Sequence, residues 1–122
     1  PLPRRAKDHK RDAIRRMLAL YDRMPFILIG DSGQKDPEIY ARIVRENPGR
    51  VLAVYIRNVT LRADRRRAIH RLAKEAAGSG CDLVLAKSTL VMAEHAARQG
   101  YIARQSVEAV EKAVNENRAE AR

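Results

Sequence analysis

Residues 24–37 constrain the fold more than any other stretch of the chain. Residues 26–29 form an unbroken apolar run, which is typical of a parallel strand covered on both faces. Gly30 and Gly33 let the backbone turn sharply after this run. Asp31 follows at the carboxyl end of the strand, where open α/β sheets bind their ligands. The stretch predicts a strand, an acidic turn and a helix, with any chemistry at the turn.

Strands and helices alternate along the rest of the chain, which predicts one α/β domain over residues 1–122. Its Rossmann-like parallel sheet is expected to lie between flanking helices as a three-layer fold. The expected strands are 26–29, 51–56 and 82–86, and the expected helices are 8–22, 36–47, 62–77, 89–99 and 106–114. Residues 1–7 are expected to be an irregular lead-in and 116–122 a frayed tail.

Apolar spacing assigns a buried and an exposed face to the expected helices. The buried stripe of the first helix is predicted to hold Ile14, Met17, Leu18 and Tyr21. The outer, solvent-exposed face of the third is predicted to hold Arg62, Arg65, Arg66, Arg67 and Arg71. Asp36 is expected to be the N-cap of the second helix, with Pro37 as its first residue.

The composition limits the classes of partner. A net charge of +10 at 122 residues favours polyanions, although most of these charges fit solvated helix faces. Four tyrosines, one phenylalanine and no tryptophan make stacking on single-stranded nucleic acid unfavourable, so a nucleic-acid partner is not expected. The single cysteine, Cys81, excludes an internal disulfide and fits a reducing, cytoplasmic compartment.

Three residues are candidates for chemistry. Asp31 and Asp36 follow the central strand, and two carboxylates there can hold one Mg²⁺ that bridges to a substrate phosphate. The alternative is structural, with Asp36 only a helix cap and the turn only a tight connection. Lys10, in the preceding helix, can neutralise a phosphoryl group near these carboxylates.

This pattern resembles the third and fourth motifs of the haloacid dehalogenase superfamily of phosphohydrolases. The closer likeness is to the phosphatidate phosphatase catalytic domain of the yeast actin-patch-protein type, which is lipin-like in chemistry. His9-Lys10, residues 26–40 and residues 54–59 carry the resemblance, and residues 89–97 and 100–102 extend it more weakly.

The resemblance implies roles for particular residues. Asp31 would bind Mg²⁺, Asp36 would support it directly or through water, and Lys10 would stabilise the phosphoryl charge. Ser32 and Gln34 would be loop residues near the metal. For Arg57 two interpretations stay open, contact with an anionic substrate or an ordinary exposed strand end.

One departure from the family pattern is informative. Phosphatases of this superfamily attack with an aspartate in an Asp-x-Asp motif, and the 122 residues contain no such motif. The chain is therefore expected to be the carboxyl-terminal part of the catalytic domain, inactive alone and completed by an amino-terminal segment. The missing nucleophile strand would leave an unpaired sheet edge, through which the chain is expected to self-associate or lose stability.

The resulting hypothesis is a Mg²⁺-dependent phosphomonoester hydrolase of phosphatidate phosphatase type, cytoplasmic or peripheral at a membrane surface. This chain would contribute the half of the active site that binds metal and stabilises phosphate. The alternative is a non-catalytic basic α/β module that binds nucleic acid or anionic lipid. The sequence leaves the physiological substrate and the oligomeric state open.

Overall fold

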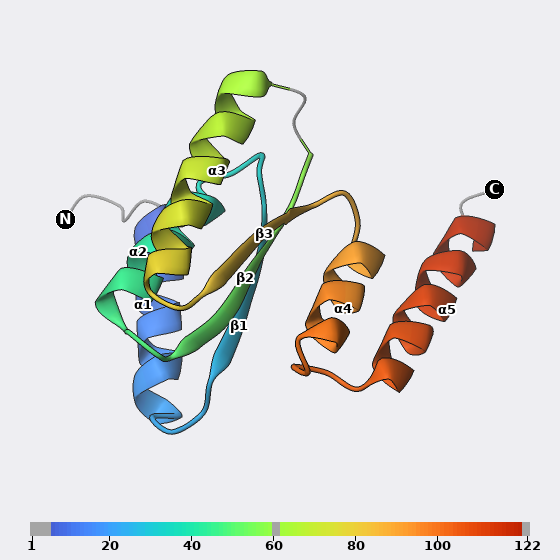
Figure 1. Cartoon of the computed structure of the whole chain (residues 1–122), viewed down its shortest axis with the longest axis horizontal. Helices are drawn as coiled ribbons and strands as arrows, with labels where there is room; N and C mark the ends of the chain where they lie inside the picture. The colour runs from blue at the N-terminus through green and yellow to red at the C-terminus, as the bar shows by residue number, and fades with distance from the viewer. Residues whose placement is uncertain (1–5, 60–61, 121–122) are drawn as a thin grey trace. The chain divides into compact units, whose positions relative to one another are not determined.

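The computed structural model describes residues 6–59 and 62–120 (Figure 1). Within them, three parallel strands form a sheet in the order β1-β2-β3, and helices flank it. The parallel α/β fold predicted from the sequence is therefore confirmed. The chain forms two compact parts, one that runs to Leu85 and another that begins at Ala86.

The sheet contains the most buried segment of the described residues, its middle strand. Its strands are β1 (Phe26–Asp31), β2 (Val51–Arg57) and β3 (Asp82–Ala86). Ala53, Val54 and Ile56 of β2 have no exposed surface. β1 pairs with β2 in parallel, and Asp31 lies opposite Arg57 at the carboxyl end of the pair. The sequence predicted all three strands, with β3 at its observed bounds and β1 and β2 slightly shorter than observed.

Helices α2 (Asp36–Glu46) and α3 (Ala63–Gly78) connect the strands. Parallel strands in sequential order with right-handed crossovers place both helices on one face of the sheet, as Figure 1 shows. Helix α1 (Ala6–Leu20) packs against α2. The core between helices and sheet is built on Leu18, Leu28, Tyr40, Ile43, Val44, Val51, Val54, Ile56, Ile69, Ala76, Cys81 and Leu83.

The first helix differs from its predicted bounds and its predicted face. It begins at Ala6 and ends at Leu20, so Ala6 and Lys7 are helical where an irregular lead-in was expected; residues 1–5 lie outside the described residues. Met17 and Tyr21 were predicted to be buried, but 46% and 43% of their surfaces are exposed. Of the four residues in the predicted stripe, Ile14 and Leu18 face the core, where α1 packs against α2.

Arg50 fixes the end of α1, although no local pattern in the sequence marks it for this role. Its Nη2 donates to the backbone oxygens of Leu18 at 3.0 Å, Tyr21 at 2.6 Å and Met24 at 3.2 Å. The guanidinium also lies 5.8 Å from the centre of the Phe26 ring. A cation that satisfies the last carbonyls of a helix replaces the helical hydrogen bonds that are lost there. Arg50 therefore ties α1 and the turn after it to the start of β2.

Glycines mark the ends of the other helices in this part of the chain. Helix α2 ends at Glu46 with Asn47 as its C-cap, and Gly49 follows at φ 78°. Helix α3 includes Gly78, one residue beyond the predicted end, and Gly80 turns the chain at φ 76°. This left-handed backbone conformation is one that glycine adopts without steric cost.

The second compact part contains α4 (Thr89–Arg98) and α5 (Arg104–Glu120), which pack against each other. The Ser88 hydroxyl caps α4 by accepting from the Val91 N–H at 3.3 Å, and Gly100 follows at φ 80°. The predicted frayed tail is wrong for residues 116–120, which are helical; residues 121–122 lie outside the described residues. The helix can continue through these residues because the sequence after Gly100 contains no proline or glycine that would break it.

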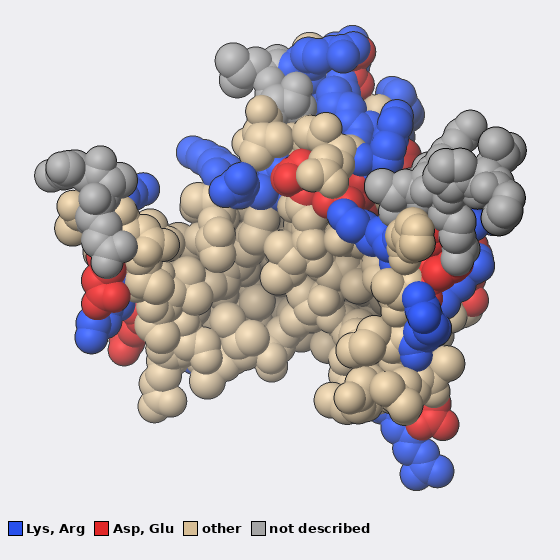
Figure 2. Space-filling view, turned by 180° about the vertical axis from the view of Figure 1, so that it is seen from behind, with Lys and Arg blue, Asp and Glu red and all other residues tan. Residues whose placement is uncertain are grey.

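Strand β1 is an edge strand, so one of its sides has no partner strand within the described residues. Ile29 of β1 is exposed, and exposed large apolar side chains also lie in the stretch that leads to this strand: Met17, Leu20, Tyr21 and Met24. Figure 2 shows a face whose middle carries no Lys, Arg, Asp or Glu, with basic and acidic side chains along its upper and lateral margins. Edge strands of this kind pair with other chains unless charge blocks them.

We expect the chain to self-associate through β1, and Ile29→Lys to shift it toward monomer. The reason is that Ile29 is 63% exposed and a lysine on an edge strand opposes strand pairing. Light scattering after size-exclusion chromatography, at several chain concentrations, measures the shift. Val91→Lys, at the 36% exposed Val91 in α4, is the control. A stable wild-type monomer at every concentration would contradict this expectation.

Candidate functional site

The turn from β1 to α2 brings two carboxylates together at the carboxyl end of β1. Asp31 is the last residue of the strand and Asp36 the first residue of α2. Gly30 makes the approach possible, since a Cβ there would lie 2.5 Å from Asp36 Oδ2 and 2.6 Å from Asp36 Cβ. The tight packing of strand against helix start therefore requires glycine at this position.

Asp36 is not the N-cap of α2, contrary to the prediction. Lys35 occupies the cap position without a side-chain hydrogen bond, and Pro37 is the second residue of the helix where it was predicted to be the first. The Asp36 carboxylate instead turns back toward β1, where Oδ2 accepts from the Asp31 N–H at 3.2 Å. The carboxylate can lie against β1 because Gly30 has no side chain to occupy that space, and in this position only 4% of Asp36 is exposed.

Lys10 crosses from α1 to this pair. Its Nζ lies 2.5 Å from Asp36 Oδ1, an ion pair between residues far apart in sequence. Asp36 is almost fully buried, so its charge needs such a partner. The ammonium has three donors, and this contact uses one of them. The structure thus places Lys10, Asp31 and Asp36 side by side at one end of β1.

Asp31 is the more open of the two carboxylates. Its Oδ1 accepts from the Gly33 N–H at 2.9 Å, which orients the carboxylate across the turn. Among the described residues, its other oxygen has no hydrogen-bond partner. The described part of the chain contains no group of three or more His, Cys, Asp or Glu side chains that could hold a metal. Two carboxylates, one with a free oxygen, suit Mg²⁺, which keeps waters and takes few protein ligands.

The remaining predicted loop residues have structural contacts. Ser32 is 3% exposed, and its hydroxyl accepts from the Val59 N–H at 2.8 Å. The Ser32 N–H donates to the Arg57 carbonyl at 3.0 Å, which continues the β1–β2 pairing past Asp31. Gln34 and the Arg57 side chain are exposed near the same end of the sheet. These contacts hold the turn in place and leave the roles of Gln34 and Arg57 open.

Arg65 lies at this turn, although it was predicted to lie on the outer, solvent-exposed face of the third helix. It is only partly exposed, and its Nη2 donates to the Gln34 carbonyl at 2.8 Å. It also forms a bidentate ion pair with Glu38 in α2. Burial tends to raise the pKa of Glu38, but the hydrogen bond and charge of Arg65 outweigh burial and leave that pKa lowered. Spacing alone does not separate Arg65 from the exposed arginines around it.

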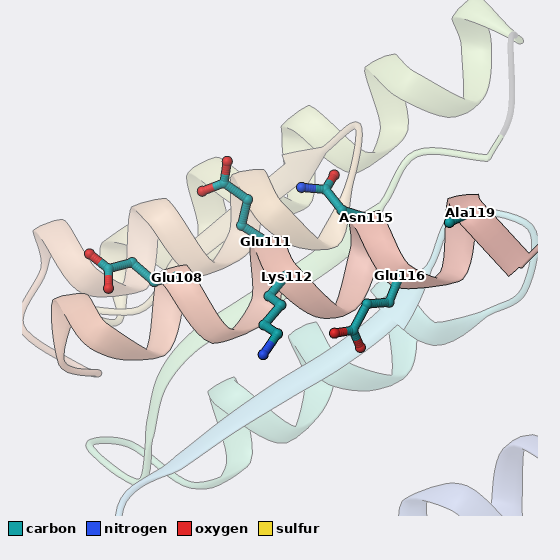
Figure 3. Close-up of a pocket in the computed structure, with 6 residues that line it drawn as sticks. All are labelled: Glu108, Glu111, Lys112, Asn115, Glu116 and Ala119. Atoms are coloured by element: carbon teal, nitrogen blue, oxygen red, sulfur yellow. The ribbon is translucent and has the colours of Figure 1, made fainter.

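A pocket of about 380 Å³ opens beside the turn. It is lined by Ser32, Gly33, Gln34, Lys35, Arg62 and Arg65. Three of these side chains are basic, which suits an anionic ligand next to Asp31. A second hollow, of about 440 Å³, is different, because every residue that lines it belongs to α5 (Figure 3). Its side chains leave a single helix in different directions, so it brings no groups together.

Tyr40 of α2 hydrogen-bonds to the backbone of β1 next to the site. Its hydroxyl donates to the Ile29 carbonyl at 2.9 Å, and 6% of the residue is exposed. Burial, followed by the negative charges of Asp36 and Asp31, raises the pKa of Tyr40 to about 12. The unfolded chain loses this proton near pH 10 and the folded chain only near pH 12. Tyr40 therefore contributes stability that is complete below pH 10 and is lost between pH 10 and 12.

We expect Tyr40→Phe to flatten this alkaline loss of stability. At neutral pH the variant should also lose about 1 kcal/mol, the net value of one hydrogen bond. Urea unfolding at pH 8, 10 and 11 gives both quantities. Tyr21→Phe, at an exposed tyrosine, is the matched control. An equally steep decline in Tyr40→Phe and wild type would show that another group controls the alkaline transition.

Fold and site together define a parallel α/β domain with an acidic, lysine-paired site at the carboxyl end of its edge strand. Residues 2–58 match the family model described as phosphatidate phosphatase APP1, catalytic domain. This segment is therefore a partial catalytic domain of that family, and the family predicted from the sequence is confirmed. Comparison with curated proteins gives no match, and comparison with solved structures gives none. Among the helices of the described residues, none combines the length and apolarity of a membrane span.

Proposed function

We propose that this chain supplies the metal-binding and phosphate-stabilising residues of a Mg²⁺-dependent phosphomonoester hydrolase of phosphatidate phosphatase type. The observation that carries the proposal is the convergence of Lys10, Asp31 and Asp36 at the carboxyl end of β1. All three lie within the segment that matches the catalytic-domain family. A divalent cation and a positive side chain can together offset the charge that a phosphate ester carries in its transition state.

The two carboxylates have separate tasks in this proposal. Asp31 would hold Mg²⁺ through its free oxygen, while Asp36 would support the bound ion through water. Both oxygens of Asp36 are already engaged, one by Lys10 and one by the Asp31 N–H. Bound Mg²⁺ would offset negative charge on the phosphoryl oxygens. Asp36 keeps Lys10 at the site, where the ammonium can donate its remaining protons to the phosphoryl group.

The basic pocket beside the turn supports an anionic substrate. Lys35 and Arg62 line it within reach of the loop that follows Asp31. Arg57, at the end of β2 opposite Asp31, would meet the same substrate from the neighbouring strand. The family indicates phosphatidate as the substrate class, so the protein would work in the cytoplasm or at a membrane surface.

Turnover needs a nucleophile as well. The 122 residues contain no Asp-x-Asp motif. Of the two carboxylates at the site, Asp31 would bind the metal and Asp36 pairs with Lys10, so neither would be the nucleophile. We therefore propose that this chain is inactive alone and acts with a segment that brings the attacking aspartate to the free side of β1. That aspartate would attack the phosphorus and form an aspartyl-phosphate as the bond to the alcohol oxygen breaks, a second carboxylate of the segment would protonate the leaving alcohol, and water would then hydrolyse the aspartyl-phosphate to phosphate.

The test has a binding readout and an activity readout. Titration of the chain with Mg²⁺, followed by calorimetry and by the amide signals of residues 30–36, should show one site. Asp31→Asn should weaken it about tenfold or more, because a carboxylate ligand loses its charge. Asp22→Asn, in the exposed turn after α1, should have no effect. Absence of Mg²⁺ binding by the wild-type chain would overturn the proposal.

Phosphate release from phosphatidate and from p-nitrophenyl phosphate, with Mg²⁺ and with EDTA, supplies the activity readout. The chain alone should release none. Metal-dependent turnover that Asp31→Asn abolishes would mean that one of its own residues is the nucleophile, and the proposed division of the active site would then be wrong.

A further inference from the structure

Three elements meet at the guanidinium of Arg65. The side chain starts from the first turn of α3 and donates to the Gln34 carbonyl at 2.8 Å and the Ser32 carbonyl at 3.3 Å. The same group makes the bidentate ion pair with Glu38, in the first turn of α2. One planar cation thus holds both ends of the segment that follows Asp31, with its donors spread over two backbone oxygens and one carboxylate.

Arg65 is connected to Asp31, the proposed metal ligand, through the backbone of residues 32–34. Ser32 and Gln34 flank Gly33, whose N–H donates to Asp31 Oδ1 at 2.9 Å. Arg65 holds the Ser32 carbonyl, which belongs to the same peptide group as that amide, and the Gln34 carbonyl, two peptide groups further on. Movement of the Ser32–Gln34 backbone would carry the Gly33 N–H with it and release the Asp31 carboxylate from its orientation.

We propose that Arg65 is a positioning residue for Asp31, which it orients through the Ser32–Gln34 backbone. This inference rests on the proposed function for its consequence, because Asp31 is the proposed Mg²⁺ ligand. A purely structural ion pair with Glu38 would need no donation to loop carbonyls. A guanidinium provides five N–H donors in a fixed plane, whereas lysine offers a single ammonium centre that cannot span these three acceptors at once.

The first test measures the turn without metal. In Arg65→Met, amide hydrogen exchange at Gly33 should become about tenfold faster, because the backbone that presents this amide loses its charge-assisted hydrogen bonds. Exchange at Val54 and Ile56, in the dry centre of β2, should stay as in wild type. Arg67→Met is the matched control, since Arg67 is exposed on the same helix.

The second test measures Mg²⁺ binding by calorimetry. Arg65→Met should weaken binding about tenfold, the usual cost of losing a group that orients a metal ligand. Arg65→Lys should give an intermediate loss, because it keeps the charge but not the fork. Glu38→Gln should give a smaller loss than Arg65→Met, because the carbonyl contacts of Arg65 remain.

The exchanged pair Arg65→Glu with Glu38→Arg separates positioning from stability. It restores an ion pair between α2 and α3, so thermal stability should recover relative to Arg65→Met. A carboxylate cannot donate to the Ser32 and Gln34 carbonyls, so exchange at Gly33 should remain fast. Wild-type Gly33 exchange in Arg65→Met, with only the melting temperature lowered, would overturn the positioning role. Failure of the wild-type chain to bind Mg²⁺ would overturn the proposed function and leave the exchange result to decide on Arg65.

Discussion

Gly30→Ala should destabilise the chain by about 3 kcal/mol and remove the Lys10–Asp36 pairing. The added Cβ would lie 2.5 Å from Asp36 Oδ2 and 2.8 Å from its Cγ, too close for any side chain to remain in place. Asp36 has only 4% exposure and cannot swing aside without moving the first turn of α2. Inserting atoms into such a packed contact costs about 1–3 kcal/mol, and here a buried charge loses its partners in addition.

Urea unfolding measures the loss, and Mg²⁺ titration shows whether the site survives. Gly78→Ala is the matched control, because a Cβ at the last residue of α3 meets nothing within 4 Å. Alanine favours helix over glycine, so this control should be neutral or slightly stabilising. Equal stability of the two variants would show that β1 and α2 can separate without cost.

Arg50→Met should destabilise the chain by about 2–3 kcal/mol. Methionine keeps the apolar stem but leaves the carbonyls of Leu18, Tyr21 and Met24 without the cation that binds them. Hydrogen bonds to a charged group contribute about 1.5–3 kcal/mol together, and the contact with Phe26 adds about 0.5 kcal/mol. Circular dichroism during urea unfolding measures the change.

The effect should be local at first. Amides at the end of α1 should exchange faster in Arg50→Met, while those of α3 should not. Arg45→Met is the control, because the Arg45 side chain is 56% exposed and its ion-pair partner, Glu75 at 3.5 Å, is equally open. Surface pairs of this kind contribute little. A control that loses as much stability as Arg50→Met would contradict the capping role.

Elements with local signals could be predicted from the sequence. β3 is predicted at its observed bounds because an apolar run lies between two breaks, Gly78-Ser79-Gly80 before it and Lys87-Ser88 after it. The Ser88 cap and the glycines after α2 and α4 are likewise encoded by neighbouring residues. The family-like run of residues 26–40 led to Asp31 and Asp36 because its chemistry is contiguous.

Contacts between distant segments could not be predicted in this way. Arg50 and Arg65 each act on backbone oxygens more than fifteen residues away in sequence, and nothing in their spacing differs from that of exposed arginines. An aspartate directly before a proline is typical of a helix N-cap, so the sequence predicted that role for Asp36. Because Gly30 has no side chain, the Asp36 carboxylate instead lies against β1 and accepts from the Asp31 N–H. That prediction failed because it weighs only the local backbone, whereas the outcome depends on a neighbouring strand.

The edge position of β1 has a consequence for how an active site of this type is assembled. A strand that adds to β1 is held in register by backbone hydrogen bonds, and each step of one residue moves its side chains by about 3.3 Å and reverses the face to which they point. Its alignment would therefore decide whether a given carboxylate arrives level with Asp31 and on the same side of the sheet. In such an arrangement, catalysis requires the added strand to pair in one exact register. A shift by a single residue would misplace the carboxylate relative to Asp31, the last residue of β1.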